Sequence, residues 1–511
     1  MLLALVVIGV ALSAVWSRKP DRRKAAAAVL SESTLPRPRS PTPGEGDQRA
    51  TGKVVLISAV AAIGGLLFGF DTAVINGAVD SIQGTFHLSP ALTGFAVSCA
   101  LLGSALGAWY AGRAADYLGR VRAMLVAAVL FAISAVGAGL AFSVWFLIGW
   151  RFAAGVGIGM ASVIAPAYIA EVAPSRIRGR LGSLQQLAIV SGIFLALLSD
   201  AFLADLVGGA SQQLWFGLAA WRWMFLAGLV PALAYGVLSL QIPESPRHLV
   251  AKGELIRAGE VLREVLGSRS AEAVQRKVAD IVASVRGDSQ RAPRLTDLRG
   301  PRFGLLPIVW VGILLSIFQQ FVGINVIFYY STSLWRSVGF SESDSLTITV
   351  ITSVTNVVVT LVAIAIVDKV GRKPMLLGGS LGMTVTLATI AACFSQAVGS
   401  GKNVSLPQPW GMIALIAANL YVVSFGATWG PVVWVLLGEM FPNWIRAVAL
   451  AVAAAAQWLA NFAITTTFPI LSHAGLSFAY GLYAAFAIIS FGFVLTSVRE
   501  TKGRELEDMT G

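Results

Sequence analysis

The sequence predicts an all-α integral membrane protein with twelve transmembrane helices in two pseudo-symmetric six-helix bundles and a helical central loop on the cytoplasmic side. Only 13% of the 511 residues are charged and 56% are hydrophobic, whereas a soluble domain carries about 25% charged residues. From Lys53 onwards the chain contains twelve apolar segments, each long enough to cross a bilayer. Charged motifs at the ends of these segments recur in the second half of the chain, which indicates two similar bundles.

The twelve segments divide six and six around a polar stretch. We expect them to be centred near residues 66, 102, 132, 158, 192, 231, 316, 357, 383, 423, 458 and 486. Helical patterning within the polar stretch covers Leu255–Leu266 and Ala273–Val285. The expected parts are an N-terminal extension and disordered linker (1–52), an N-terminal bundle (53–242), a cytoplasmic loop with helices (243–302), a C-terminal bundle (303–498) and a short cytoplasmic tail (499–511).

The distribution of positive charge predicts the topology. The central loop is rich in Lys and Arg, while the loops at 80–90 and 203–220 contain neither residue. By the positive-inside rule the central loop is cytoplasmic, and so are both ends of the twelve-helix core. We therefore expect a multi-pass protein of the inner (plasma) membrane.

The N-terminal extension has a different character from the rest. Residues 1–16 are apolar and are followed by basic residues, which reverses the order of a secretory signal. They form either a short anchor or sequence upstream of the true start. The stretch Ser31–Thr51 is rich in Pro, Ser and Gly and reads as a disordered linker, so we expect the extension to be dispensable.

The composition excludes several functional classes. The net charge of +12 is clustered between apolar segments rather than on one basic face, so nucleic acid is not an expected partner. Cys99 and Cys393 lie within apolar segments, and the three His residues flank no ligand-spaced cluster, so we expect neither a metal site nor a cofactor. No nucleophile-base constellation or phosphate loop indicates an enzyme.

Two motifs occur twice. The loop Gly112–Arg122 is echoed by Asp368–Lys373, and the segment Glu171–Arg178 is echoed by Glu439–Arg446. Repeats at equivalent helix ends are typical of transporters in which two halves rock against each other.

Asp71 is the only charged residue between Val54 and Val79. A carboxylate at that depth costs at least ~2.5 kcal/mol, so an ionisable group there indicates function. Arg151 is the other charge set within an apolar segment of the same half, and pairing is the cheaper arrangement for two buried charges. The alternative is a fixed structural bridge that never titrates.

Three amides lie in the seventh segment: Gln319, Gln320 and Asn325. Amides both donate and accept hydrogen bonds, which matches the hydroxyls of a sugar. A regular helix would not direct all three to one point, but Gly323 permits a break between them. The alternative is that these amides only join helices. Gly155, Gly157 and Gly159 lie in mid-membrane with no preceding strand, so we expect close helix packing there rather than a dinucleotide site.

These motifs resemble those of the sugar porter family of the major facilitator superfamily, in particular its bacterial glucose and xylose proton symporters, including the cyanobacterial-type glucose carriers. The resemblance covers residues from about Lys53 to Glu505. The motifs that carry it are Gly64–Gly77, Gly112–Arg122, Arg151–Gly159, Glu171–Arg180, Pro243–Arg247, Gln319–Asn325, Asp368–Arg372, Gly430–Trp434, Glu439–Arg446 and Glu500–Gly503.

The resemblance implies roles for further residues. It places Gln186, Asn356, Trp434, Gln457 and Trp458 in a sugar site with the three amides, where Trp suits the apolar face of a pyranose. It assigns occlusion or gating to Phe68 and Tyr329. It also implies a cytoplasmic ion-pair lattice that holds the inner ends of the halves together, formed by Arg113, Asp116, Arg120, Glu171, Arg178, Arg180, Asp368, Arg372, Glu439 and Arg446.

The resemblance implies import of a monosaccharide, glucose above all, by proton symport, with a hexose and a proton as partners and a monomer as the working unit. Proton-coupled relatives have Asp at the position of Asp71. Two positions depart from relatives: Ile193 stands where xylose carriers have Gln, and Gly228 stands where several symporters have Glu. The alternatives are a proton-independent hexose facilitator and a transporter-like sugar sensor.

Overall fold

The computed structural model describes residues 50–173, 178–266, 271–290, 295–301, 304–398, 405–442 and 445–500. Most of the expected N-terminal extension and most of the expected tail lie outside these ranges.

The regular structure of the described residues is helical. The first half of the chain forms α3 (Ala50–Val74), η1 (Asn76–Ala78), α4 (Val79–Phe86), α5 (Pro90–Leu118), α6 (Arg120–Gly139), α7 (Val144–Val172), α8 (Arg178–Asp205), α9 (Ala220–Ala227) and α10 (Leu229–Ser239). The centre and second half form α11 (Pro246–Ala251), α12 (Leu255–Leu266), α13 (Ala271–Gln290), η2 (Leu295–Leu298), α14 (Pro307–Phe321), α15 (Ile324–Ser337), α16 (Glu342–Val370), α17 (Arg372–Phe394), α18 (Trp410–Gly426), α19 (Trp429–Met440), α20 (Arg446–Ala474) and α21 (Leu476–Ser497).

Twelve stretches of the described chain are long and apolar enough to cross a membrane. Each of the twelve predicted segment centres falls inside one of them, so the number and order of the spans are confirmed. The helices expected in the central loop are confirmed as α12 and α13, although α13 extends beyond the predicted range at both ends.

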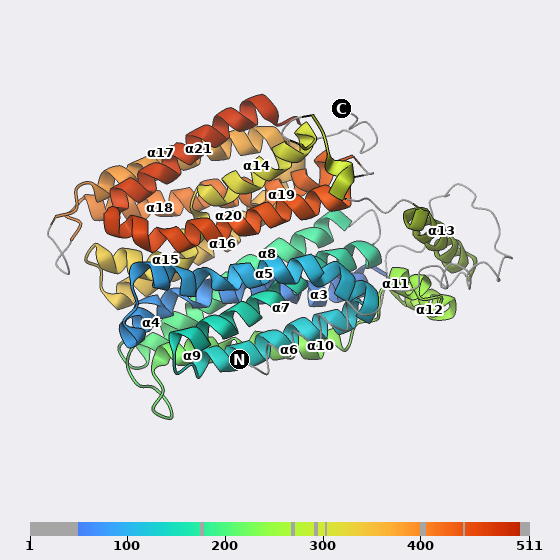
Figure 1. Ribbon diagram of the computed structural model, residues 1–511, viewed down its shortest axis with the longest axis horizontal. Coiled ribbons are helices and arrows are strands. Elements are labelled where there is room, and N and C mark those ends of the chain that lie inside the picture. Colours follow the sequence, from blue (N-terminus) through green and yellow to red (C-terminus); the bar gives the residue numbers. More distant parts are fainter. Residues whose placement is uncertain are drawn as a thin grey trace.

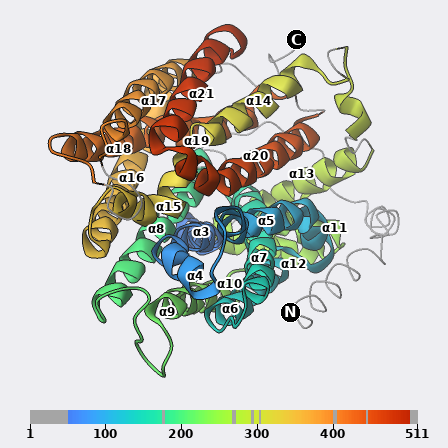
Figure 2. The ribbon, with the colours of Figure 1, turned by 60° about the vertical axis from the view of Figure 1, so that its left-hand side comes forward.

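The helices lie in two groups that follow the order of the chain. Figures 1 and 2 show α3–α10 (blue to green) on one side and α14–α21 (yellow to red) on the other. The two groups are called here the first half and the second half. They meet mainly where α5 packs against α20 and α8 against α16.

Helices α11–α13 project from one end of the molecule, which we call the central-loop end (Figure 1). They form a small core of their own, made by apolar residues such as Leu249, Leu262 and Val278. The opposite end, called the far end, carries η1, α4, the start of α9 and the end of α15 (Figure 1).

Several spans consist of two helices rather than one. The first span breaks at η1, the sixth at Gly228, the seventh at Val322–Gly323 and the tenth at Ala427–Thr428. Breaks free backbone polar groups, which is tolerated in a membrane protein where other protein groups satisfy them.

Glycines allow α5 and α7 to approach closely. A Cβ on Gly155 of α7 would overlap the backbone carbonyl of Ala100 on α5, and a Cβ on Gly159 would overlap that of Ser104. Gly157 faces Ala127 of α6 instead. The expectation of close packing at these three glycines is confirmed, and it explains why small residues recur at helix contacts in membranes.

We predict that Gly155→Ala lowers the free energy of unfolding by about 1–3 kcal/mol, because the added methyl must push α5 and α7 apart. The measurement is the melting temperature of the detergent-solubilised protein. Gly492→Ala on α21 is the matched control, since a Cβ at Gly492 meets nothing within 4 Å. Equal melting temperatures for the two variants would contradict the prediction.

Candidate functional site

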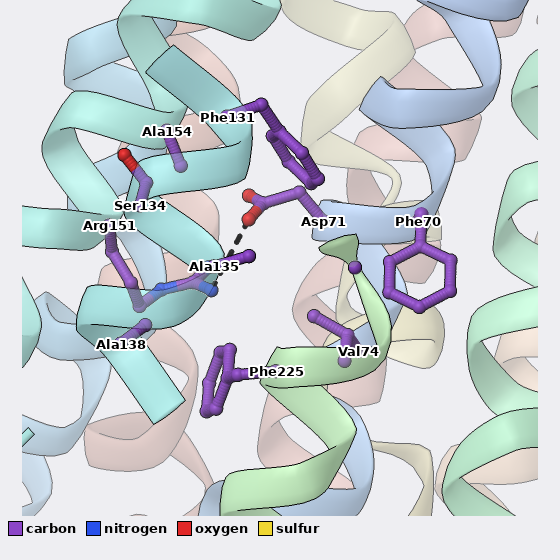
Figure 3. Close-up of a pocket in the computed structure, with 11 residues that line it drawn as sticks. Phe70, Asp71, Val74, Phe131, Ser134, Ala135, Ala138, Arg151, Ala154 and Phe225 are labelled. Carbon is purple, nitrogen blue, oxygen red and sulfur yellow. Dashed lines mark ion pairs between the residues drawn. The ribbon is translucent and has the colours of Figure 1, made fainter. Parts of the chain in front are cut away.

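Asp71 and Arg151 face each other between α3 and α7 (Figure 3). The distance from Arg151 Nη1 to Asp71 Oδ1 is 3.7 Å, and both side chains are buried. Arg151 also donates from Nη2 to the carbonyl of Val97 on α5 at 3.1 Å, and its guanidinium lies 5.8 Å from the ring centroid of Phe225. Its Nε and Nη1 atoms have no hydrogen-bond partner among the described residues. The predicted pairing is present, and it consists of one long contact.

A small cavity of about 10 Å³ adjoins the pair, which is roughly the space of one water molecule. Besides Asp71 and Arg151 it is lined by residues such as Phe131, Ser134 and Gly228 (Figure 3). Gly228, which separates α9 from α10, therefore leaves room beside the carboxylate where a larger side chain would meet Phe70 and Phe131.

The break after α14 brings the three amides of the seventh span together. Gly323 has φ +84°, a left-handed conformation that glycine adopts without strain. The chain turns there, and Asn325 Nδ2 then donates to Gln320 Oε1 at 2.5 Å. Gln320 Nε2 in turn lies 3.5 Å from Gln319 Oε1. The predicted break at Gly323 is confirmed, and it directs side chains that a regular helix would separate.

The chain of amides continues into a third helix. Gln457 on α20 donates from Nε2 to Gln319 Oε1 at 2.7 Å. Gln319 Nε2 donates to the carbonyls of Trp429 and Gly430 on α19, at 3.0 and 3.4 Å. Gln319 thus joins helices, as the alternative interpretation expected. Gln457 Oε1 is buried without a partner among the described residues.

Two contacts connect the surroundings of Asp71 with the second half. The ring of Phe68 meets the ring of Trp458 edge to face, with 5.3 Å between centroids. Helix α3 also packs against α15, on which Tyr329 is buried. Phe68 lies about one turn before Asp71 on α3, and Asp71 points toward Arg151 of α7. Of the two aromatic residues predicted to gate the pathway, Phe68 thus lies on the helix of Asp71 and contacts the second half, and Tyr329 lies on a helix of the second half that packs against α3.

The other residues predicted for the sugar site are spread over three helices. Asn356 is buried on α16, and its Oδ1 is 3.1 Å from the position of a Cβ on Gly426. Gln186 on α8 is half-buried, and Trp434 on α19 is 41% exposed. These three side chains do not take part in the amide chain in this conformation.

The repeated charged motifs form two matching clusters at the central-loop end. In the first half, Arg120 donates to both carboxylate oxygens of Glu171, at 2.8 and 3.0 Å, and lies 3.6 Å from Asp116. Glu244 accepts from the backbone amides of Arg120 and Val121 at the start of α6. In the second half Arg372 pairs in the same way with Glu439, and Glu500 accepts from the amides of Arg372 and Lys373.

Both of these Arg–Glu pairs lie within one half. In this conformation Arg120–Glu171 and Arg372–Glu439 tie together helices of the same bundle, instead of the two halves as expected. Arg113 lies 5.8 Å from the ring centroid of Tyr110. The side chains of Arg178, Arg180, Asp368 and Arg446, which were expected in the lattice, lie outside the described residues.

His248 on α11 adds to the first cluster. Its Nδ1 accepts from Arg120 Nη1 at 3.1 Å, and Ser245 donates to Glu171 at 2.5 Å. Burial and the adjacent positive charge of Arg120 lower the pKa of His248 to about 4. The imidazole is therefore neutral near pH 7 and can accept this hydrogen bond.

The two halves are joined at the far end. Asn76 of η1 donates to the carbonyl of Phe328 at 2.9 Å and accepts from the amide of Thr332 at 3.1 Å. Asp80 on α4 forms an ion pair with Arg336 at 2.7 Å and accepts from Ser333 at 2.6 Å. The structure is therefore closed at the far end.

Three kinds of residue in these clusters were not predicted. Asn76 and Asp80 lie at the end of an apolar segment, where polar residues usually indicate the start of a loop. Glu244, Ser245 and His248 belong to a motif noted for its resemblance but not for its contacts. Asp200 on α8 is fully buried, and none of the motifs in the sequence pointed to it.

Comparisons with known proteins agree with this architecture. The family model described as "Sugar (and other) transporter" matches residues 57–511. The glucose transport protein of Synechocystis is 59% identical over 458 residues, which cover 89% of this chain and 97% of that protein. The D-xylose-proton symporter of Escherichia coli K12 is 38% identical over 487 residues, covering 89% of this chain and 94% of that protein.

Solved structures show the same fold. The proton:xylose symporter XylE of the major facilitator superfamily, bound to 6-bromo-6-deoxy-D-glucose, superimposes with a TM-score of 0.73 at 36% identity, covering 90% of this chain and 98% of the other. The inward-open conformation of XylE from E. coli gives 0.74 at 36% identity, covering 89% and 99%. The predicted twelve-helix fold of the major facilitator superfamily is confirmed, and this chain belongs to the sugar (and other) transporter family.

Proposed function

We propose that this protein imports a monosaccharide, glucose in the first place, by proton symport through alternating access. The observation that carries the proposal is the contact between Phe68 and Trp458, because it joins the Asp71–Arg151 pair of one half to the amide chain of the other. The printed names of the relatives, a glucose transport protein and a D-xylose-proton symporter, support the substrate class and the coupling.

The amide chain is the proposed sugar site. Gln320, Asn325 and Gln457 offer donors and acceptors at the break in the seventh span, which suits the hydroxyls of a hexose. Trp458 lies beside Gln457 and supplies an apolar face. Gln186, Asn356 and Trp434 would join when the halves close around the sugar, since they stand apart from the amide chain in this conformation.

The Asp71–Arg151 pair is the proposed coupling site. A single contact of 3.7 Å holds two charges that are otherwise costly in a low-dielectric environment. Protonation of Asp71 would remove that attraction and leave Arg151 with the carbonyl of Val97. The position of α3 against Trp458 and Tyr329 would then change, so that proton binding alters the sugar site.

We further propose the sidedness and the moving parts. The basic central loop would face the cytoplasm in the inner membrane, together with both ends of the twelve-helix core. The far end would then face outward, and its closure would make this a conformation that is shut toward the outside. The bundles 53–242 and 303–498 would move as the two units, and because one chain holds both sites, a monomer would suffice.

A facilitator without proton coupling is the second candidate. The feature that favours it is Gly228, which lines the cavity beside Asp71 and provides no second acid there. The two functions differ in one measurement, because only a symporter makes the medium alkaline when sugar is added to deenergised cells.

We predict that Asp71→Asn abolishes accumulation of glucose against a gradient but leaves counterflow exchange, because the neutral amide keeps the shape of the carboxyl and cannot release a proton. The measurement is uptake of labelled glucose into proteoliposomes, with and without an imposed proton gradient. Asp205→Asn is the control, since Asp205 is an exposed carboxylate at the end of α8. Full accumulation by Asp71→Asn would contradict the mechanism.

We predict that Gln320→Ala weakens sugar binding by about 1–3 kcal/mol, or roughly 5- to 150-fold in Kd, because it removes the partner of Asn325. Binding of labelled glucose, galactose, fructose and xylose to the purified protein measures the effect and the specificity. Asn419→Ala on α18 is the matched control, an amide within a span of the same half whose donor serves its own helix. Equal Kd values for Gln320→Ala and the unchanged protein would place the sugar elsewhere.

A further inference from the structure

Asp200 is a buried carboxyl that the proposed function does not use. It lies on α8, and its side chain is 0% exposed. Its Oδ2 accepts one hydrogen bond, from the backbone amide of Gly77 at 3.2 Å. Its Oδ1 is buried and has no hydrogen-bond partner among the described residues. A carboxylate with a single donor and no counter-ion costs several kcal/mol in such surroundings, whereas the neutral acid costs far less.

Among the described residues no charged side chain forms an ion pair with Asp200. The elements packed against α8 include α3, α7, α9, α16 and η1. Their described charged side chains form no ion pair with Asp200; these are Lys53, Asp71, Arg151, Glu171, Arg222, Glu342, Asp344 and Lys369. Asp205, on α8 itself, is exposed. The local geometry therefore accommodates Asp200 as the neutral acid.

The partner of Asp200 belongs to the closure of the far end. Gly77 follows Asn76, whose side chain bridges to the carbonyl of Phe328 and the amide of Thr332 on α15. A Cβ on Gly77 would lie 2.9 Å from both Cβ and Oδ2 of Asp200, so η1 is seated directly against this side chain. Helix η1 is thus held between α8 of its own half and α15 of the other.

We propose that Asp200 is a second proton-binding carboxyl and that it controls the far-end closure. Neutral Asp200 seats η1 where Asn76 reaches α15. When η1 leaves α8, water reaches the carboxyl, which releases its proton to the far side and thereby favours the open state. On closing, the carboxylate takes a proton back from the same side, so Asp200 adds no proton to the transport stoichiometry. This inference rests on the proposed function only in requiring that the far end opens.

The test measures the opening directly with a cysteine reporter. Thr332→Cys is introduced after Cys99 and Cys393 are replaced by Ala, because Thr332 is 4% exposed in the closed state and keeps its backbone contact to Asn76. Ser98→Cys is a second reporter, at a hydrogen bond of 2.6 Å to Thr466 between the halves. Labelling by an impermeant maleimide from the far side is normalised to the labelling of Gln212→Cys. Gln212 is exposed, so a thiol there is labelled without opening of the far end and corrects for the ionisation of the thiol itself.

We expect the normalised labelling rate to rise with external pH, by up to about tenfold per pH unit, because opening releases one proton. Asp200→Asn retains an acceptor for the amide of Gly77 and remains neutral, so its labelling is low and independent of pH. Asp200→Ala loses the acceptor and is labelled faster at all pH values. The pH dependence persists in Asp71→Asn.

An unchanged pH dependence in Asp200→Asn would overturn the inference, even if that variant melts at a lower temperature, because it would leave Asp200 with a structural role only. A pH dependence lost in Asp71→Asn instead would assign the effect to the other carboxyl and overturn the inference as well. Labelling requires no sugar and no proton gradient. The result therefore stands apart from the uptake measurement that tests symport.

Discussion

The buried guanidinium of Arg151 is the constraint on which the first half depends. A permanent charge within a membrane span must find its partners inside the protein. It brings together α3, which supplies Asp71, α5, which supplies the carbonyl of Val97, and α9, which supplies the ring of Phe225. Gly155, one turn further along α7, allows α5 to pack closely beside this side chain. Among the described residues, Nε and Nη1 of Arg151 have no hydrogen-bond partner, so the guanidinium can change partners when Asp71 is protonated.

The second half meets a different demand, set by its broken spans. The breaks at Val322–Gly323 and Ala427–Thr428 leave backbone carbonyls without their helical hydrogen bonds, and lipid tails cannot donate to them. Tyr421 donates to the carbonyl of Val322, at the first break, at 2.7 Å. Gln319 donates to the carbonyls of Trp429 and Gly430 in the first turn of α19, directly after the second break. Gln319, a member of the amide chain, therefore also joins α14 to α19 next to the second break. The same side chain thus serves both the packing of these helices and the proposed sugar site.

Most features that depend on the length of apolar segments, or on the free-energy cost of a buried charge, could be predicted from the sequence. Apolar segments long enough to span a bilayer predicted the helices. The free-energy cost of an isolated buried charge predicted the pairing of Asp71 with Arg151, and Gly323 indicated the break in the seventh span. Contacts between distant segments were harder to predict. Gln457 is 138 residues from Gln319, and no local pattern relates them. Asp200 was not predicted, because its burial against η1 is a tertiary property that no local pattern shows. Which residues surround Trp434 depends on the conformation, so periodicity alone does not determine its exposure.

The matching clusters at Arg120 and Arg372 have a mechanical consequence. Glu244, Ser245 and His248 fasten α11 to the first half, and Lys53 of α3 contacts Glu264 of α12 at 2.5 Å. The first part of the central loop, α11 and α12, is thus attached to the first bundle and would move with it, without restraining its motion relative to the second bundle. Because α13 packs against α11 and α12, a relative rotation of the two bundles has to be accommodated after this group of three helices. The central loop can therefore be long and basic without hindering the relative movement of the two bundles during transport.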